Sequence, residues 1–451
     1  MTPENTLSAV APVAAQERIQ SMDVLRGAAV LGILLMNILS FALPGRAYAD
    51  PSIAGGDTGL NWAYWFANQV FFEGKMRAIF SMLFGAGTAL FIARAAERGA
   101  GLRIADIYYR RTMWLIVFGL LHGYFVWGGD ILYAYGVAGL LLFPLRQANP
   151  KWLLALGVFL VLAGSAKYYW DDYENLKLRN KAMAVRALEA QGKPLTEEQK
   201  EDKKKWDDKW NDLKPSGAAL DKELKAKTGS YWQHLQYRWP RITDGHGNGF
   251  YQYDFYDCGG MMLIGMALFL MGVLTGARDT GFYARLALFG YLVGGSVNAY
   301  AGWYWSRSGF DPVEGRMVGD LAYDFGRLSM ALAHLSVLVL LVKHGWLVAA
   351  TRRLAACGRM ALTCYLFSNL AGTTIFYGHG FGLFNKLQRY QLLYVVFAIW
   401  ALLLLVSPIW LRHFRYGPME WVWRSLTYWK KQPMRLLAKE AAPQLEPSTV
   451  A

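Results

Sequence analysis

The chain has 451 residues, of which 54% are hydrophobic and 15% aromatic, and its formal net charge is +14. Apolar runs of 15 to 24 residues recur along it, and a helix needs about 20 residues to cross a bilayer. This composition excludes a soluble globular protein, and the long runs exclude the short alternating strands of a membrane β-barrel. We therefore predict an all-α, polytopic membrane protein.

Ten apolar segments have the length and composition of membrane-spanning helices. In chain order they are residues 24–43, 78–93, 112–127, 131–145, 152–168, 258–275, 282–305, 328–342, 361–377 and 392–411. The connections after the second, fourth, sixth and eighth segments, counted with Arg285 at the start of the seventh segment and with the C-terminal tail, contain 20 Lys and Arg but only six Asp and Glu. Because basic loops stay in the cytoplasm, both termini are predicted to be cytoplasmic.

The predicted spans divide the chain into five parts. These are a flexible N-terminal tail (1–20), a first transmembrane bundle (21–170), an external insert (171–255), a second bundle with a tail motif (256–428) and a cytoplasmic tail (429–451). The insert holds 16 basic and 15 acidic residues, and loops this long are not governed by the charge rule. Thr196 and Gln199 predict a capping box at the start of a solvated helix. The insert is either a charged helical hairpin standing off the membrane or an arm that binds a partner.

Four polar side chains lie deep inside four different predicted spans. Counted from the basic residues at the predicted cytoplasmic edge, Asn37, His122, His334 and Asn369 lie about 16, 16, 14 and 15 Å along their helices. The hydrocarbon core is about 30 Å thick, so these residues are predicted to meet near its middle. Such a cluster is either a buried polar site, with a histidine as general base or proton carrier, or a set of hydrogen bonds that hold helices together.

The surroundings of His122 favour the functional interpretation. It lies in "GLLHGYFVWGGDILYAYG", where glycines allow a ligand or a backbone to approach closely. Asp130 in the following short loop either orients His122 or caps the next helix. His334 lies in the plainer apolar context "MALAHLSVL".

A charged group precedes the second predicted span, on its external side. Glu73 and Arg77 are four residues apart and can pair on one helix face, and Lys75 adds a positive charge where the charge rule does not place one. This group is predicted either to bind substrate at the outer mouth or to anchor the helix at the interface. A stripe of small residues suited to close helix packing follows: Ser81, Gly85 and Ala89.

Charged residues also gather at the predicted cytoplasmic edge. They are Asp23, Arg26, Arg110, Arg111 and Arg359. The arginines either determine topology or hold the phosphates of an anionic cofactor. The three cysteines show neither metal-ligand spacing nor a disulfide framework, so no metal is expected. The motifs of soluble nucleotide-binding enzymes and hydrolases are absent from the sequence, and no nucleic-acid partner is expected.

Several motifs resemble, in order, those of the YeiB-like family of bacterial membrane proteins, which carries a domain of unknown function numbered 418. They are "MDVLRGAAVLGILLMNIL", "FFEGKMRAIFSMLFGAGTALF", "RRTMWLIVFGLLHGYFVWGGDILYAYGVAGLLL", "GRMALTCYLFSNL", "FYGHGFGLF" and "RYGPMEWVWRSLTY". The resemblance runs from Ser21 to about Tyr428 and is interrupted by the insert. It implies a multi-pass protein of the bacterial cytoplasmic (inner) membrane.

The family is similar to transmembrane acyltransferases of the heparan glucosaminide acetyltransferase type. Their first-helix pattern "LDxxRG" is matched by Asp23, Arg26 and Gly27, with Met22 in place of Leu. The resemblance implies transfer from cytoplasmic acyl-CoA, with His122 of the family's "GLLH" motif as the implicated histidine. The chain departs from the acetyltransferase where "FEGK" replaces that enzyme's histidine motif, and from the YeiB-like family at Cys364, where Asn is usual.

We therefore expect an acyltransferase with acyl-CoA as co-substrate and no permanently bound cofactor. Basic residues near Arg26 and Arg359 would hold the phosphates, His122 would deprotonate the acceptor, and Asn37 or Asn369 would stabilise the oxyanion. The acceptor, an envelope glycan or a small molecule, would enter past Glu73. The alternatives are a transporter or channel for a polar or anionic solute and a non-catalytic scaffold.

Overall fold

The computed structural model describes residues 18–99, 101, 103–215 and 217–436. These residues form helices and turns, and their one extended pairing is an isolated bridge between Phe414 and Arg435. The predicted all-α class is confirmed. Five segments are long and apolar enough to cross a membrane: Gln20–Ala42, Gly59–Glu97, Pro150–Ala190, Ala322–Lys343 and Arg389–His413. The other five predicted spans coincide with helices below those limits, so the ten-span count stays a prediction.

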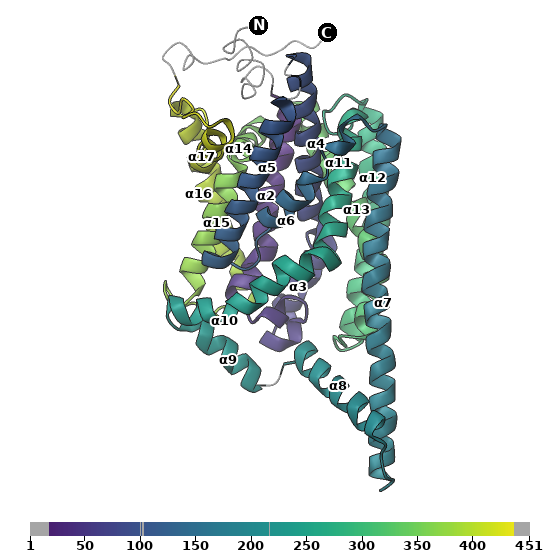
Figure 1. The fold of residues 1–451 in the computed structure, drawn as a ribbon. Coiled ribbons are helices and arrows are strands. Elements are labelled where there is room, and N and C mark those ends of the chain that lie inside the picture. The colour runs from purple at the N-terminus through teal and green to yellow at the C-terminus, as the bar shows by residue number, and fades with distance from the viewer. Residues whose placement is uncertain (1–17, 100, 102, 216, 437–451) are drawn as a thin grey trace.

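Most helices form one upright bundle (Figure 1). Its members are α2 (Gln20–Ala42), α4 (Lys75–Glu97), α5 (Arg103–Phe125), α6 (Leu132–Leu140), α11 (Gly260–Leu270), α12 (Thr280–Arg307), α13 (Glu314–Lys343), α14 (Val348–Arg359), α15 (Ala361–Phe376) and α16 (Leu392–His413). Helices from before and after the insert pack together around α2, which contacts α4, α13, α14, α15 and α16. Gly27 and Gly358 permit this packing, because a side-chain carbon on either would overlap a backbone carbonyl of the other helix.

Short elements close the two ends of the bundle. Helix α17 (Pro418–Tyr428) covers one end, here called the α17 end, and α8 to α10 lie at the opposite, insert end. The remaining short elements are α3 (Gly59–Phe71) and the 3-10 turns η2 (Gly45–Tyr48), η3 (Pro51–Ala54), η4 (Pro144–Gln147) and η6 (Arg389–Gln391).

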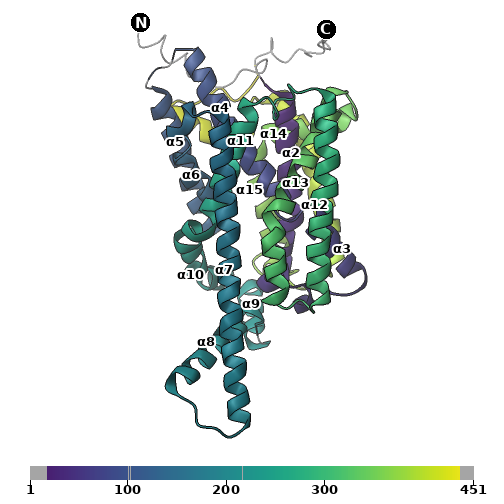
Figure 2. The same cartoon turned by 90° about the vertical axis from the view of Figure 1, so that its right-hand side faces the viewer.

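Helix α7 (Pro150–Ala190) continues well past the bundle (Figure 2). Its 41 residues extend about 60 Å, twice the thickness of a hydrocarbon core. The predicted span 152–168 and the first part of the insert are therefore one helix. No proline or glycine follows Gly164 inside it, so nothing local ends the helix at the predicted domain boundary.

Helix α8 (Glu197–Leu213) folds back against the projecting part of α7. The predicted capping box of Thr196 and Gln199 is confirmed at its start. Ion pairs such as Lys181–Asp202 (3.1 Å) link α7 to α8 across their exposed faces. Helices α7 and α8 therefore form a charged hairpin, whereas its position outside the membrane stays a prediction.

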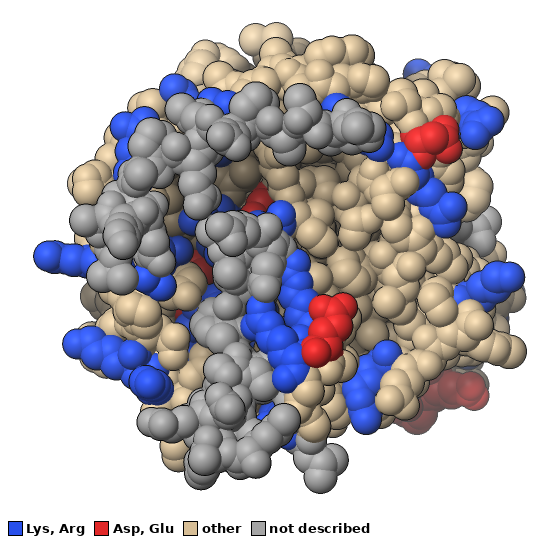
Figure 3. All heavy atoms as spheres, turned by 90° about the horizontal axis from the view of Figure 1, so that it is seen from above, with Lys and Arg blue, Asp and Glu red and all other residues tan. Residues whose placement is uncertain are grey.

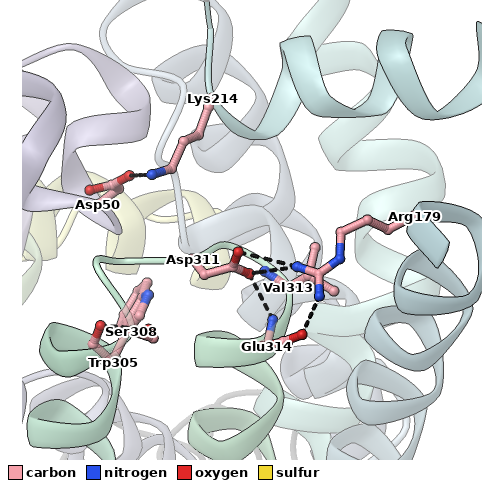
Figure 4. Close-up of polar contacts among 8 residues, drawn as sticks. All are labelled: Asp50, Arg179, Lys214, Trp305, Ser308, Asp311, Val313 and Glu314. Carbon is pink, nitrogen blue, oxygen red and sulfur yellow. Dashed lines mark hydrogen bonds and ion pairs between the residues drawn. The ribbon is translucent and has the colours of Figure 1, made fainter. Parts of the chain in front are cut away.

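The base of this hairpin is tied to the bundle by polar contacts (Figure 4). Arg179 of α7 pairs with Asp311 at 3.2 Å and also with Glu314. Asp311 accepts hydrogen bonds from the backbone N–H groups of Val313 and Glu314, each at 2.9 Å, so it also caps the start of α13. Lys214, which directly follows α8, pairs with Asp50 at the start of η3 at 3.7 Å.

The second half of the insert does not stand off the bundle. Helices α9 (Gly217–Thr228) and α10 (Tyr231–Asp244) lie across the insert end. Arg238 donates to the carbonyls of Val126 and Tyr124 at 2.7 and 2.8 Å, and the Lys227 carbonyl accepts from Gly378 N–H at 2.9 Å. A π-helical segment, η5 (Gly245–Gly259), then runs directly into α11, so the predicted domain start at residue 256 also falls inside a helical run.

The connections rich in Lys and Arg share the α17 end. Lys343 after α13 donates to the carbonyls of Gly276 and Arg278 after α11, at 2.9 and 3.0 Å. Trp423 of α17 donates to the carbonyl of Arg111 on α5 at 2.9 Å. Figure 3 looks onto this end and shows many Lys and Arg side chains beside few Asp and Glu. The grouping agrees with the charge pattern behind the predicted orientation.

The small-residue stripe on α4 yields a matched pair of variants. A side-chain carbon on Gly85 would overlap the Met262 carbonyl of α11, whereas one on Gly87 would meet nothing within 4 Å. We expect Gly85→Ala to destabilise the protein by about 1–3 kcal/mol, because overpacking forces the helices apart, and Gly87→Ala to be close to neutral. Thermal unfolding of the detergent-solubilised protein measures this difference. Equal unfolding temperatures for the two variants would contradict the packing of α4 on α11.

Candidate functional site

Three cavities lie in a row through the bundle. The arginine chamber, at the α17 end, has a volume of about 240 Å³; the central cavity has about 330 Å³; and the insert-side chamber has about 270 Å³. Tyr365 lines both the arginine chamber and the central cavity. Tyr48, Glu73 and Arg77 line both the central cavity and the insert-side chamber. Neighbouring cavities therefore share lining residues.

The arginine chamber has a strong excess of positive charge. Six arginines and two acids line it: Arg18, Arg26, Arg94, Arg111, Arg359, Arg424, Asp23 and Glu420. Glu420 is engaged elsewhere, because it accepts from the backbone N–H groups of Leu362 and Thr363 at the start of α15, at 2.7 and 3.1 Å. Among the described residues, Asp23 is thus the one lining carboxylate that pairs with the chamber arginines.

Asp23 forms ion pairs with two arginines. Its carboxylate pairs with Arg26 at 3.0 Å and with Arg18 at 3.7 Å. Burial, followed by the nearby charge of Arg359, lowers the pKa of Arg18 to about 10, and burial lowers the pKa of Arg359 as well. The pKa of Arg18 remains far above neutral pH, and arginine side chains are not deprotonated in proteins. The chamber therefore keeps its positive charge and favours an anion.

Two of the predicted cofactor-binding arginines have different surroundings. Arg111 lies in the chamber with its guanidinium 4.3 Å from the ring centre of Trp423. Arg110 is not part of the chamber lining: it pairs with Asp106 and lies over the ring of Trp429. Asp23, Arg26, Arg111 and Arg359 are thus brought together, and Arg110 is not.

Much of the remaining lining of the arginine chamber is apolar. Side chains of α4, α5 and α6 contribute to it, namely Phe80, Leu83, Phe84, Leu115 and Leu132. A ligand with an anionic head and an apolar chain matches this division, because phosphates pair with arginines and an acyl chain gains by leaving water. Acyl-CoA has this chemistry.

A buried polar group lies beside the central cavity. His122 Nδ1 is 2.8 Å from Asp130 Oδ1, and His122 Nε2 is 3.1 Å from the amide nitrogen of Asn369. With the Asn369 amide donating to Nε2, the proton of the neutral ring is on Nδ1, facing Asp130. The predicted meeting of His122 with Asn369 from a distant helix is therefore confirmed.

Asp130 has both of the functions that the sequence left open. One carboxylate oxygen accepts from His122, and the other accepts from Tyr133 N–H at 2.7 Å at the start of α6. Asp130 lines the central cavity together with Asn37 and Tyr365, whereas His122 lies behind them, 3% exposed. The side chain of Asp130 is fully buried as well, so the His122–Asp130 pair lies buried at the edge of the cavity.

His334 does not join this group, so its predicted convergence with the other three is wrong. Its Nδ1 is 2.8 Å from the Tyr291 hydroxyl, its Nε2 is 2.8 Å from the Phe71 carbonyl, and its ring stacks on Phe72. It lines none of the three cavities. His334 lies at about the same depth along its helix as His122, but depth does not determine which way a side chain faces.

Glu73, Lys75 and Arg77 are brought together in the insert-side chamber. Arg77 pairs with Asp257 at 2.8 Å, and Arg327 pairs with the same carboxylate at 2.6 Å. Sequence reasoning missed Asp257 and Arg327, each of which directly precedes a predicted span, beginning at position 258 or 328. A charge directly adjoining an apolar run was the signal that was available.

Titration of the acids on η5 reflects these contacts. Burial disfavours the Asp257 carboxylate, but Arg327 and Arg77 outweigh that cost and hold its pKa at about 2. Burial raises the pKa of Asp254, which lines the central cavity, to about 6, with Arg77 acting in the opposite direction. Asp257 is therefore a fixed negative charge, whereas Asp254 titrates close to neutral pH.

Known proteins similar to this chain cover almost its whole length. The protein YeiB of Escherichia coli (strain K12) is 32% identical over 424 residues, which is 91% of this chain and 96% of YeiB. The protein YxaH of Bacillus subtilis (strain 168) is 26% identical over 450 residues, covering 95% and 98% of the two chains. Both are described as uncharacterised.

A third relative is the 39.9 kDa protein in the amylase 3' region of Bacillus acidopullulyticus, which is 29% identical over 435 residues, 95% of this chain and 99% of that one. Residues 268–430 match the model of a family described as a protein of unknown function, DUF418. The chain is an all-helical protein with membrane-spanning helices, and it belongs to the YeiB-like, DUF418 family.

Proposed function

We propose that this protein is an acyltransferase of the bacterial cytoplasmic membrane. It takes an acyl group from cytoplasmic acyl-CoA and gives it to an acceptor that enters from the outside. In this proposal ten helices span the membrane, both termini are cytoplasmic, and the arginine chamber opens on the cytoplasm. The observation that carries the proposal is the row of three cavities, with excess positive charge at one end and a buried His–Asp pair midway.

The donor is held by the arginine chamber. The phosphates of acyl-CoA pair with arginines such as Arg18 and Arg359, whose charges Asp23 balances only in part. The acyl chain and thioester lie along the apolar wall toward Tyr365. Because Tyr365 also lines the central cavity, movement of this one ring gives the thioester access to the acceptor.

The His122–Asp130 pair is the acid–base unit. The acceptor oxygen or nitrogen forms a bond to the thioester carbonyl carbon, and its proton passes to the pair, whose Asp130 is part of the cavity lining. The carbon–sulfur bond then breaks, and the pair returns the proton to the leaving thiolate. Asn37, which lines the same cavity, donates a hydrogen bond to the oxyanion. Asn369 is a positioning residue that holds the His122 ring.

The second candidate is a transporter for a polar or anionic solute. The observation that favours it is the same continuity of cavities, since a translocation path also links both sides through a polar midpoint. Proteoliposomes separate the two functions. The acyltransferase requires acyl-CoA for turnover and moves no solute without it, whereas a transporter carries solute in the absence of CoA.

Two histidines of similar depth provide a direct test of the acid–base unit. We expect His122→Gln to lower acyl transfer by about 100-fold or more, because general acid–base catalysis contributes that much, while acyl-CoA binding persists. His334→Gln is the control, since His334 lines none of the cavities, and it should keep wild-type turnover. Radiolabelled acyl transfer and equilibrium binding measure the two effects. Equal loss in both variants would remove the assigned role of His122.

Two arginines near the α17 end test the donor site. Arg359→Gln should weaken acyl-CoA binding about tenfold or more, the usual effect of losing a charge-assisted hydrogen bond. Arg110→Gln serves as the control, because Arg110 pairs with Asp106 outside the chamber. Titration calorimetry with acetyl-CoA and with a longer acyl-CoA gives both affinities. Failure of the wild-type protein to bind any acyl-CoA would overturn the proposed function.

A further inference from the structure

The insert-side chamber combines charges of both signs in equal number. Four cationic and four acidic side chains line it: Lys75, Arg77, Arg316, Arg327, Glu73, Asp257, Asp320 and Asp324. With every group ionised these charges cancel, so the chamber differs from the arginine chamber, which attracts anions. A ligand with no net charge therefore matches it best.

Most of these charges already have partners. Asp257 pairs with both Arg77 (2.8 Å) and Arg327 (2.6 Å), and Asp324 also pairs with Arg327. Arg316 pairs with Asp320 at 3.3 Å. These contacts form a network along the chamber wall, as buried charges require.

Two opposite charges remain without an ion pair. Lys75 is 1% exposed, and its ammonium donates to the Gln69 carbonyl at 2.7 Å and to Asn298 Oδ1 at 3.1 Å, with no carboxylate within 4.0 Å among the described residues. Glu73 accepts from the Tyr48 hydroxyl at 2.7 Å, and no described Lys, Arg or His lies within 4.0 Å of it. Glu73 is partly buried, whereas Lys75 is fully buried, and leaving a buried charge such as that of Lys75 unpaired is costly.

Arg327 adds unused donors to the same chamber. It is 1% exposed, and its Nε and Nη1 atoms are buried with no hydrogen-bond partner, although Nη2 is paired twice. Buried donors of this kind are rare in folded proteins. Together with Lys75 they provide the donors that a carboxylate of a bound molecule requires.

A tight turn places Glu73 and Lys75 on the chamber. Gly74 between them has φ of +72°, a left-handed conformation that favours glycine. A side chain there would also overlap the Tyr323 hydroxyl and Arg327. The turn therefore packs directly beneath Arg327, with the unpaired acid and the unpaired base on either side of it.

We propose that the insert-side chamber binds a small zwitterion that carries an ammonium and a carboxylate group, that is, an amino acid or a close analogue. Its carboxylate accepts hydrogen bonds from Lys75 and from the unused donors of Arg327, and its ammonium pairs with Glu73. A neutral polyol would leave Lys75 and Glu73 without counter-charges, and an anion would disturb a chamber whose charges cancel. The volume of about 270 Å³ admits one small molecule.

The zwitterion also suits the acyl acceptor, and this role alone rests on the proposed function. Glu73 lines both the chamber and the central cavity, so the amine end lies on the side of the His122–Asp130 pair. After the ammonium loses one proton, its nitrogen attacks the thioester and forms an amide. The second proton goes through the pair to the thiolate. The products are an N-acyl amino acid, CoA thiol and one released proton.

The test is ligand binding by the purified full-length protein in detergent, without CoA. Each of the twenty common L-amino acids is assayed by equilibrium dialysis, and any that binds is compared with its carboxamide and its N-acetyl derivative. We expect at least one to bind, and blocking either charged group to weaken binding tenfold or more. Glu73→Gln and Lys75→Met should each do the same, whereas Lys167→Met, at a lysine that pairs with Asp171 outside the chamber lining, should not.

Lys75→Arg keeps the positive charge and is therefore the control for a folding defect in Lys75→Met. Restored binding in Lys75→Arg supports a carboxylate site, and equal failure of both in folded protein, judged by thermal unfolding, overturns it. Binding of no amino acid also overturns the inference, even if acyl transfer to another acceptor is found. Amino-acid binding without any acyl-CoA turnover supports the zwitterion site and overturns the proposed function instead.

Discussion

The cost of holding charge away from water governs this structure. A charged side chain inside an apolar bundle is stable only if it meets a counter-charge, a hydrogen-bond partner or a polar cavity. Asp257 shows the first solution, because two arginines share its carboxylate. Lys75 shows the second, because its ammonium donates to the Gln69 carbonyl and to Asn298. The arginine chamber shows the third, and its excess charge is the reason to expect an anionic ligand there.

Close helix packing makes room for these groups without loosening the bundle. Gly27 and Gly358 let α2 and α14 meet backbone to backbone, and Gly85 does the same for α4 and α11. Small residues at such contacts are the usual means by which helices associate in a bilayer. Helix α2 is thereby held at the centre of the bundle. Its Asp23 lines the arginine chamber and its Asn37 lines the central cavity.

The candidate site was predictable where a residue had a local signature. Glycines around His122 and the short spacing to Asp130 indicated their contact, and the shared depth of His122 and Asn369 indicated that they meet. His334 has the same depth and Arg110 lies at the same basic edge as Arg111, yet both lie outside the cavities. Asp257 and Arg327 had weaker signatures and lie in the insert-side chamber. Depth and charge can be read along one helix, whereas the direction of a side chain depends on its neighbours.

The sequence by itself determined the all-helical membrane class, the start of α8 and the collection of basic connections at one end, because hydropathy, capping and charge are local properties. Tertiary structure alone decided that α7 continues into the insert, that α9 and α10 dock on the bundle, and that three cavities share walls. It also decided that Lys75 and Glu73 lack ion-pair partners among the described residues. Whether two charged side chains form an ion pair depends on which distant helices meet. The order of residue types along one segment does not reveal which helices those are.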